Sequence, residues 1–111
     1  MNLPTEVFGE IVVAHTPEEL GEDQAEQLVE HLTNLDKSKV ILDLDGTETI
    51  DSEGLAALLA VRDGLVGNDG ELKITTTNAV NRKILEITRL DEHLEVFESV
   101  IDAVKSFVCP G

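Results

Sequence analysis

Apolar residues along the chain form two kinds of pattern, short runs that are continuous or alternating and stripes spaced three or four residues apart. The runs lie at 7–14, 40–44, 72–76 and 94–97. Such runs predict β-strands, and the break at Gly9-Glu10 predicts a turn inside the first of them. The stripes lie at 23–35, 55–66, 80–87 and 100–107 and predict amphipathic helices. Because strands alternate with helices, the pattern predicts an α/β fold with a largely parallel sheet.

Individual residues refine these elements. The almost continuously apolar run 40–44 predicts a strand covered on both faces. Asn78 and Ser99 are placed to cap the last two helices, and Gly67 and Gly70 bracket the turn after the second. The predicted inner positions of the first, second and fourth helices are, in turn, Ala25, Leu28, Val29, Leu32 and Leu35; Leu55, Leu58, Leu59, Leu65 and Val66; and Val100, Ile101, Val104 and Phe107.

Composition sets the size of the domain and the character of its partners. We expect the 111 residues to form one domain, 1–111, with a core over about 7–107. Apolar residues make up 41% and aromatic residues 3%, which predicts an aliphatic core. The 23 acidic and 8 basic residues give a formal net charge of −15. Such a chain is repelled by nucleic acid and by anionic membranes, so a protein partner is expected to offer a basic face, although solubility alone also accounts for the acidity.

The cysteine, the histidines and the first residues of the chain give no indication of a metal site, a disulfide framework or a secretion signal. The lone Cys109 excludes a disulfide framework and a cysteine metal site, which suits a reducing cytosol. His15, His31 and His93 lack the short spacing of a zinc helix and are expected to be partly exposed. The first ten residues lack the features of a secretion signal, and the longest apolar run, 55–61, is too short to span a membrane. We therefore expect a cytoplasmic domain with no metal and no cofactor.

The segment from Asp43 to Thr47 follows an apolar strand and resembles the opening motif of haloacid-dehalogenase-type phosphohydrolases. That resemblance implies Asp43 as nucleophile and Asp45 as acid/base, with both holding Mg²⁺. These enzymes place the motif strand first in the fold, whereas here a unit with a helix precedes it. The downstream lysine and second acidic pair have no convincing counterpart either. A strand end with solvated acids is the alternative interpretation.

A second candidate lies in the loop before the second helix. Ser52 stands where a helix N-cap belongs, with its hydroxyl exposed. Phosphorylation would add about −1.5 to −2 charges, which a helix N-terminus favours. The fold would then survive the modification, while a docked partner would meet a new charged group. A plain N-cap is the alternative interpretation of this serine.

The stretch VILDLDGTETIDSEGLAALLAV, residues 40–61, resembles the strand–loop–helix of STAS domains, notably the bacterial anti-sigma factor antagonists. Those proteins carry an apolar strand, then an Asp-Ser-x-Gly-Leu motif. Further likeness follows at 70–72, 78–85, 88–91 and 96–99, and the resemblance covers about residues 20–105. It implies a STAS fold, a small mixed and mostly parallel sheet with helices packed on it.

The resemblance also implies a function. The domain would bind an anti-sigma factor that is a serine kinase of the histidine-kinase-like ATPase type, and it would be no enzyme itself. Carried over to this chain, Ser52 is the phosphorylated residue, and Asp51, Ser52, Glu53 and Gly54 contact the partner. Gly54 would let two backbones approach closely. We expect a monomer or a weak dimer.

Two departures from the family pattern leave a non-phosphorylated scaffold or sensory STAS protein as the alternative. The family motif Gly-Glu-Leu-Asp aligns with residues 18–21, where Gly21 replaces the Asp unless Asp23 substitutes for it. Glu53 stands where Ser, Thr or Ala is common, and its carboxylate would repel an incoming phosphate. The acids Glu18, Glu19, Glu22 and Asp23 serve solubility and the helix start, or meet a basic kinase.

Overall fold

A five-stranded mixed sheet forms the centre of the molecule. The computed structural model describes residues 4–33 and 38–108, so that Leu35 and Cys109 lie outside the described residues. The strands run in the order β1 (Thr5–Phe8), β2 (Ile11–His15), β4 (Lys39–Asp43), β6 (Glu71–Thr75) and β7 (Glu95–Phe97). Only β1 is antiparallel to its neighbour, to which it is joined by a turn at Gly9 with φ +63°. The predicted α/β fold with a mostly parallel sheet is confirmed.

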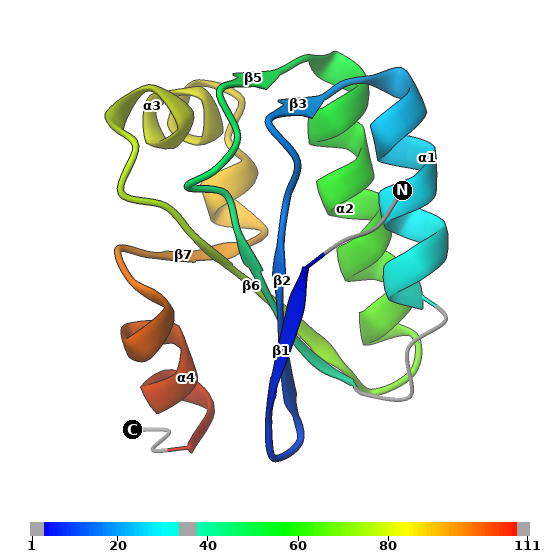
Figure 1. Cartoon of the computed structure of the whole chain (residues 1–111), viewed down its shortest axis with the longest axis vertical. Coiled ribbons are helices and arrows are strands. Elements are labelled where there is room, and N and C mark those ends of the chain that lie inside the picture. The colour runs from blue at the N-terminus through cyan, green and yellow to red at the C-terminus, as the bar shows by residue number, and fades with distance from the viewer. Residues whose placement is uncertain (1–3, 34–37, 109–111) are drawn as a thin grey trace.

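Helices cover both faces of this sheet unequally (Figure 1). The elements are α1 (Glu22–Thr33), α2 (Ser52–Val66), α3 (Ala79–Ile87), the short 3-10 helix η1 (Leu90–Glu92) and α4 (Val100–Val108). Residues of α1, α2, α3 and η1 join one apolar cluster with the sheet, whereas α4 packs by itself on the opposite face. No helix within the described residues is long and apolar enough to cross a bilayer.

The central strand β4 separates two apolar cores. Val40 and Leu42 point into the larger cluster, while Ile41 points into the smaller cluster beneath α4. All three side chains are fully buried, as the continuous apolar run predicted. The core is aliphatic on the larger side, and Phe97 and Phe107 contribute to the smaller one.

Two predicted inner residues are exposed instead. Ile101 is 66% exposed and Val66 is 49% exposed. In α4, Ala103 occupies the centre of the inner face, and Ile101 is displaced around the helix from it. Val66 follows the buried Leu65, and one residue corresponds to a rotation of about 100° around the helix. The Val66 side chain therefore lies outside the buried face. The caps at Asn78 and Ser99 are confirmed, since both side chains accept backbone N–H groups of the following turn.

Candidate functional site

The candidate site lies at the carboxyl ends of the parallel strands, in the loop that joins β4 to α2. This loop passes through β5 (Thr49–Ile50), which pairs with β3 (Glu19–Leu20) in a separate two-stranded parallel sheet. The small sheet stands near the top of Figure 1, beside the start of α2. It ties the segment before α1 to the segment before α2. The starts of both helices are therefore held together.

Two buried threonines hold the first half of the loop. The Thr47 hydroxyl donates to the carbonyl oxygen of Pro17 at 2.5 Å, and it also contacts the Thr16 hydroxyl. Thr16 is fixed in turn by its backbone N–H, which donates to the carbonyl oxygen of Asp43 at 3.1 Å. Because buried polar groups need partners, these contacts restrict the loop to one path. No role was predicted for either hydroxyl from the sequence.

A buried asparagine ties the same loop to α3. The side-chain amide of Asn81 donates to the carbonyl oxygen of Thr47 at 2.9 Å and lies 3.5 Å from that of Leu44. Asn81 is 1% exposed, on the buried side of a helix whose Leu85 is also fully buried. Residues four positions apart lie on the same face of a helix, so a polar residue four positions before a buried leucine is itself expected to be buried and to need a hydrogen-bond partner. The sequence therefore carries a signal for the role of Asn81.

The start of α2 differs from the prediction. Asp51 is the N-cap, because its side chain accepts the N–H of Gly54 at 3.0 Å, and Ser52 is the first residue of the helix. The predicted N-cap role of Ser52 is therefore wrong. The backbone N–H of Asp51 still donates to the carbonyl oxygen of Leu20, at 3.3 Å, so the chain turns into the helix one residue earlier than expected.

This shift leaves the Ser52 side chain uncommitted. Ser52 is exposed, and its hydroxyl forms no hydrogen bond with the described residues. Exposed carboxylate residues stand on both sides of it, Asp51 and Glu53. The hydroxyl is thus accessible, at the positive end of a helix of 15 residues.

Gly54 allows the β3–β5 sheet to lie against α2. A Cβ atom built on Gly54 would collide with the carbonyl oxygen of Leu20 and would lie 3.0 Å from the Leu20 Cγ. The expectation that Gly54 permits a close backbone approach is confirmed. The partner of that approach is within the chain itself, the end of β3.

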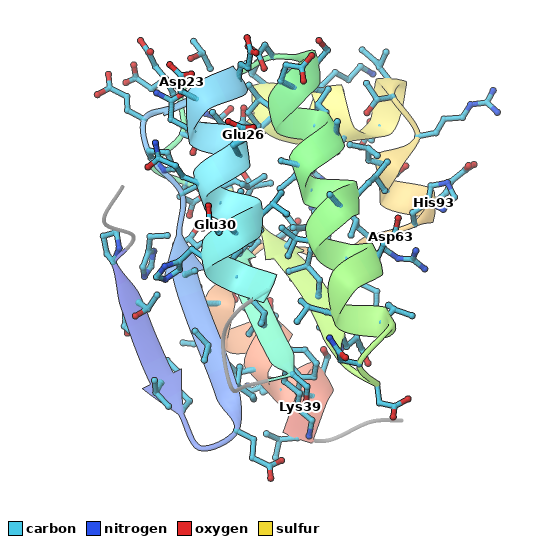
Figure 2. The ribbon with its side chains drawn as sticks, turned by 90° about the vertical axis from the view of Figure 1, so that its right-hand side faces the viewer. Asp23, Glu26, Glu30, Lys39, Asp63 and His93 are labelled. Atoms are coloured by element: carbon cyan, nitrogen blue, oxygen red, sulfur yellow. The ribbon has the colours of Figure 1, made fainter. Side chains whose placement is uncertain are left out.

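The position that carries the aspartate of the family motif does lie beside the candidate site. A Cβ atom built on Gly21 would lie 3.2 Å from Oδ2 of Asp51. Asp23 is an exposed residue in the first turn of α1 (Figure 2). Among the described residues no hydrogen bond or ion pair joins Asp23 to the residues around Ser52, so nothing in the structure makes it a substitute for the missing side chain.

The two carboxylates of the phosphohydrolase interpretation are turned toward different partners. The Asp43 carboxylate lies 3.0 Å from His15 Nδ1 and accepts the backbone N–H of Asp45. The Asp45 carboxylate accepts the backbone N–H and the hydroxyl of Thr77 at 2.5 and 3.1 Å. Within the described residues there is also no group of three metal-ligating side chains. This arrangement supports the interpretation as a strand end.

His15 is more engaged than the sequence predicted. Its second ring nitrogen, Nε2, lies 3.0 Å from Glu6 Oε1, so the imidazole joins β1 to β4 across β2. His31 and His93 are exposed, in agreement with expectation. The histidine side chain is thus part of the sheet's structure, and the sequence carried no spacing from which this could be predicted.

Comparison with known proteins identifies the fold. The chain matches the family model of the STAS domain over residues 2–103. An anti-sigma factor antagonist from Mycobacterium paratuberculosis is 19% identical with a TM-score of 0.83, with 95% of this chain and 92% of that chain covered. An anti-sigma-factor antagonist (STAS) domain protein from Planctomyces limnophilus is 17% identical with a TM-score of 0.78, covering 94% and 95%.

The Bacillus cell fate determinant SpoIIAA is similar in two forms. The unphosphorylated form is 16% identical with a TM-score of 0.75, over 99% of this chain and 100% of that chain. The phosphorylated form is 18% identical with a TM-score of 0.72, over 96% and 99%. At these identities the likeness concerns the fold, whereas the family model covers almost the whole sequence. The resemblance read from residues 40–61 is thereby confirmed, and the chain belongs to the STAS-domain family.

Proposed function

We propose that this protein is an anti-sigma factor antagonist-like interaction module controlled by phosphorylation of Ser52. Its partner is an anti-sigma factor that is a serine kinase of the histidine-kinase-like ATPase type, and the protein is the substrate of that kinase rather than an enzyme. Partner contacts centre on the exposed residues Asp51, Ser52 and Glu53, whereas the expected contact through Gly54 is replaced by packing of this buried residue against Leu20. The interaction takes place in the cytoplasm. The observation that carries the proposal is the exposed, uncommitted hydroxyl of Ser52 at the first position of α2.

The local structure supports a modification that leaves the fold intact. The cap that fixes the start of α2 is supplied by Asp51, so phosphorylation of Ser52 removes no hydrogen bond from the helix. A helix N-terminus stabilises a negative group by about 0.3–1 kcal/mol. The buried contacts of Thr16, Thr47 and Asn81 hold the loop from the inside, away from the modified side chain.

The chemical step is a phosphoryl transfer from ATP. The Ser52 oxygen forms a bond to the γ-phosphorus, the bond between that phosphorus and the bridging oxygen breaks, and ADP leaves. The hydroxyl proton passes to a base of the kinase. The phosphoserine places about −1.5 to −2 charges and added bulk at the contact, which separates the two surfaces. Phosphorylation therefore ends the interaction.

Mass spectrometry of the intact chain mixed with its kinase and ATP tests this proposal. We expect one added phosphoryl group, mapped to Ser52 and absent from the Ser52→Ala variant. Ser38→Ala is the matched control, because Ser38 is also exposed and lies outside the site. Wild-type protein that gains no phosphoryl group would refute the assignment.

Binding measurements test the consequence. Ser52→Asp is expected to weaken binding to the unmodified kinase, whereas Ser52→Ala is expected to keep it. The distinction holds because both variants lose the hydroxyl while only one gains a charge. Equal binding by the two variants would contradict control through Ser52.

A second candidate is a scaffold or sensory STAS protein that is not phosphorylated. Two observations favour it: Gly21 lacks the side chain that would lie beside Asp51, and Glu53 places a carboxylate next to the acceptor. A carboxylate there repels the γ-phosphate of ATP. In this case Glu53→Ser is expected to create phosphorylation that the wild-type chain lacks, whereas the first candidate requires phosphorylation of the wild-type chain.

A further inference from the structure

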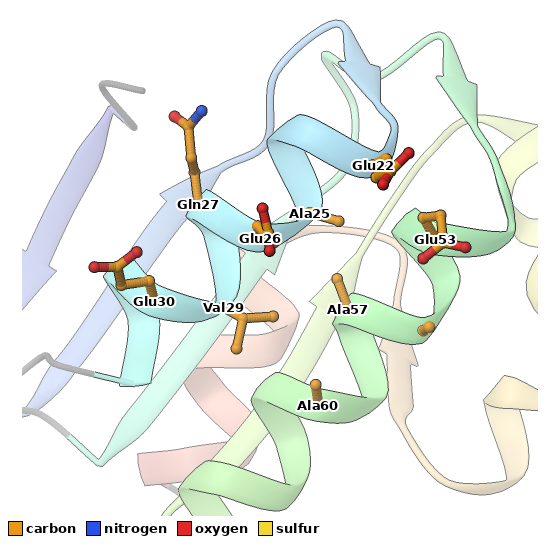
Figure 3. A pocket seen from close by; sticks show the side chains of 10 residues that line it. Glu22, Ala25, Glu26, Gln27, Val29, Glu30, Glu53, Ala57 and Ala60 are labelled. Carbon is orange, nitrogen blue, oxygen red and sulfur yellow. The ribbon is translucent and has the colours of Figure 1, made fainter.

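A groove lies between α1 and α2 and reaches the residue that follows Ser52. It encloses about 630 Å³. Its lining consists of Glu22, Ala25, Glu26, Gln27, Val29, Glu30, Glu53, Ala56, Ala57 and Ala60 (Figure 3). Both helices contribute, and Figure 2 shows them side by side on one surface of the molecule.

The apolar part of the groove is formed almost wholly by alanine. Ala25 and Ala57 are buried between the helices, and Ala56 and Ala60 are exposed along α2. Because alanine side chains are short, a third element can approach the backbones of both helices closely. The groove follows α1 for the eight-residue interval between Glu22 and Glu30, which is about 12 Å or two helical turns.

The polar part of the groove is acidic. Glu22 of α1 and Glu53 of α2 stand at the same end of it in Figure 3, and Glu26 follows one turn along α1. None of these three carboxylates forms an ion pair with a described residue. The lining contains no lysine or arginine, so the field of the carboxylates is not neutralised locally.

We propose that this groove binds a basic amphipathic helix of the partner protein. Small side chains on the partner helix pack against the alanine floor, and a lysine or arginine lies between Glu22 and Glu53. A second basic residue four positions further along that helix reaches Glu26, because α1 spaces its acids by the same interval. The inference rests on the proposed function, since it assigns to its partner a surface that adjoins Ser52.

Other occupants fit the groove less well. A second copy of the chain would bring the same acidic groove, or another part of a surface with net charge −15, against these glutamates. A small polar ligand would find one amide, Gln27, as the only donor side chain in the lining. A metal site is not supported, as no group of three ligating side chains occurs among the residues described.

A designed peptide tests the groove without the kinase. The probe is a capped helical peptide of about 16 residues made of alanine, leucine and lysine, with lysine at every fourth position. A peptide with glutamate at each lysine position is its control. Titrated into the ¹⁵N-labelled chain, the lysine peptide is expected to shift amide signals of α1 and α2, and the glutamate peptide to shift none.

Two matched pairs of variants separate shape from charge. Ala60→Trp fills the groove and is expected to weaken peptide binding by about tenfold or more, whereas Ala79→Trp, at an exposed position of α3, leaves it unchanged. Glu26→Lys is expected to weaken binding by about threefold to tenfold, whereas Glu98→Lys, an equal change of charge outside the groove, changes it less. All four substitutions are at exposed positions, so folding is retained.

Several outcomes would overturn the inference. The lysine peptide could shift amide signals outside α1 and α2, or it could bind the Ala60→Trp variant as tightly as the wild type. A dimer observed by sedimentation and disrupted by Ala60→Trp would assign the groove to a second copy of the chain. Failure of the proposed function looks different. If the groove binds the peptide while the kinase leaves Ser52 unmodified, only phosphorylation fails; if the kinase modifies and binds wild type and Ala60→Trp alike, only the groove fails.

Discussion

Three buried threonine hydroxyls near the candidate site differ in whether they find a partner. The Thr47 hydroxyl donates to the carbonyl oxygen of Pro17, and the single proton of the Thr16 hydroxyl is shared between the Thr47 hydroxyl and the carbonyl oxygen of Asp43. The Thr75 hydroxyl is buried in β6 and has no hydrogen-bond partner among the described residues. An unpartnered buried hydroxyl costs stability, whereas a bonded one supports it. The same residue type therefore has opposite energetic roles within a few residues of the loop.

Replacing threonine by valine at the two kinds of position is expected to act in opposite directions. Thr75→Val removes an unsatisfied group and is expected to raise the free energy of unfolding by about 1 kcal/mol. Thr47→Val leaves the Pro17 carbonyl without its donor and is expected to lower it by about 1–3 kcal/mol. Urea unfolding followed by circular dichroism measures both, since the chain has no Trp or Tyr for fluorescence. A loss at both positions would contradict the assignment.

A second residue-scale prediction concerns glycine. Gly54→Ala places a methyl group against the Leu20 carbonyl oxygen, which belongs to backbone and cannot rotate away. We expect a loss of about 1–3 kcal/mol. Gly67→Ala is the control, because its Cβ atom would meet Asp63 O at 3.4 Å with an ordinary φ of −62°. The control is expected to be neutral or slightly stabilising, and equal losses in both variants would argue against a close approach at Gly54.

At this scale the sequence predicted the site residues but not their roles. Asp51 and Ser52 are both common N-cap residues, so propensity alone does not decide between them. The decision comes from a non-local contact, the hydrogen bond from the Asp51 backbone to Leu20. Asn81, on the buried side of α3, carried a usable signal, whereas the partners of Thr16 and Thr47 depend on a chain path that no local pattern encodes.

At the scale of elements, α4 packs on the sheet apart from the other helices. It covers the smaller core through Ala103, with Val100, Val104 and Phe107 packed around it. A buried lysine of β6 supports it: Lys73 Nζ lies 2.5 Å from Ser106 Oγ and 4.3 Å from the centre of the Phe107 ring. Glu71 and Glu95 lie 3.2 and 3.5 Å from the same nitrogen. Lys73 thus joins the sheet to α4 by packing, hydrogen bonding and charge.

Truncating this lysine is expected to loosen α4 before the rest of the fold. Lys73→Ala removes the buried stem and the contact with the rings, at a cost of about 2 kcal/mol or more. Lys73→Met keeps a stem of similar length and is expected to lose about half of that or less. Amide hydrogen exchange in α4 measures the effect, and exposed Lys105→Ala is the control. Equal losses in the alanine and methionine variants would show that the charge alone matters.

The long elements were predictable and the shortest were not. In α1, α2, α4, β2, β4 and β6 an apolar pattern determines the type of element, because one or both of its faces are buried. The four residues of β1 are exposed, and in α3 the apolar residues Val80 and Ile87 are 65% and 70% exposed. Strands β3 and β5 have two residues each, too few for any alternation to appear. Their pairing nevertheless places the starts of α1 and α2 side by side, and with them the groove and Ser52.

At the scale of the whole molecule, charge opposes compactness. The chain carries a formal net charge of −15, and described ion pairs involve few of its acids. Like charges held on one compact surface repel each other more than they do in the unfolded chain. The acidity that would favour a basic partner therefore lowers the free energy of unfolding of the free protein, and this effect is sensitive to salt.

We therefore expect salt to stabilise the free protein. Raising NaCl from about 10 mM to about 150 mM shortens the screening length from about 30 Å to about 8 Å. This is smaller than the molecule, whose longest extent is 32 Å. Relief of about 1 kcal/mol of repulsion corresponds to a rise of about 5 °C in the midpoint of thermal unfolding.

A variant with less charge separates screening from other effects of salt. Glu18, Glu92 and Glu98 are exposed and form no ion pair among the described residues. Changing all three to lysine is expected to raise the unfolding midpoint at low salt and to shrink its salt dependence, because fewer like charges remain to be screened. Three glutamine substitutions at the same positions should give about half of that effect. A thermal unfolding midpoint that does not change with salt in any variant would show that the repulsion is already relieved within the folded chain.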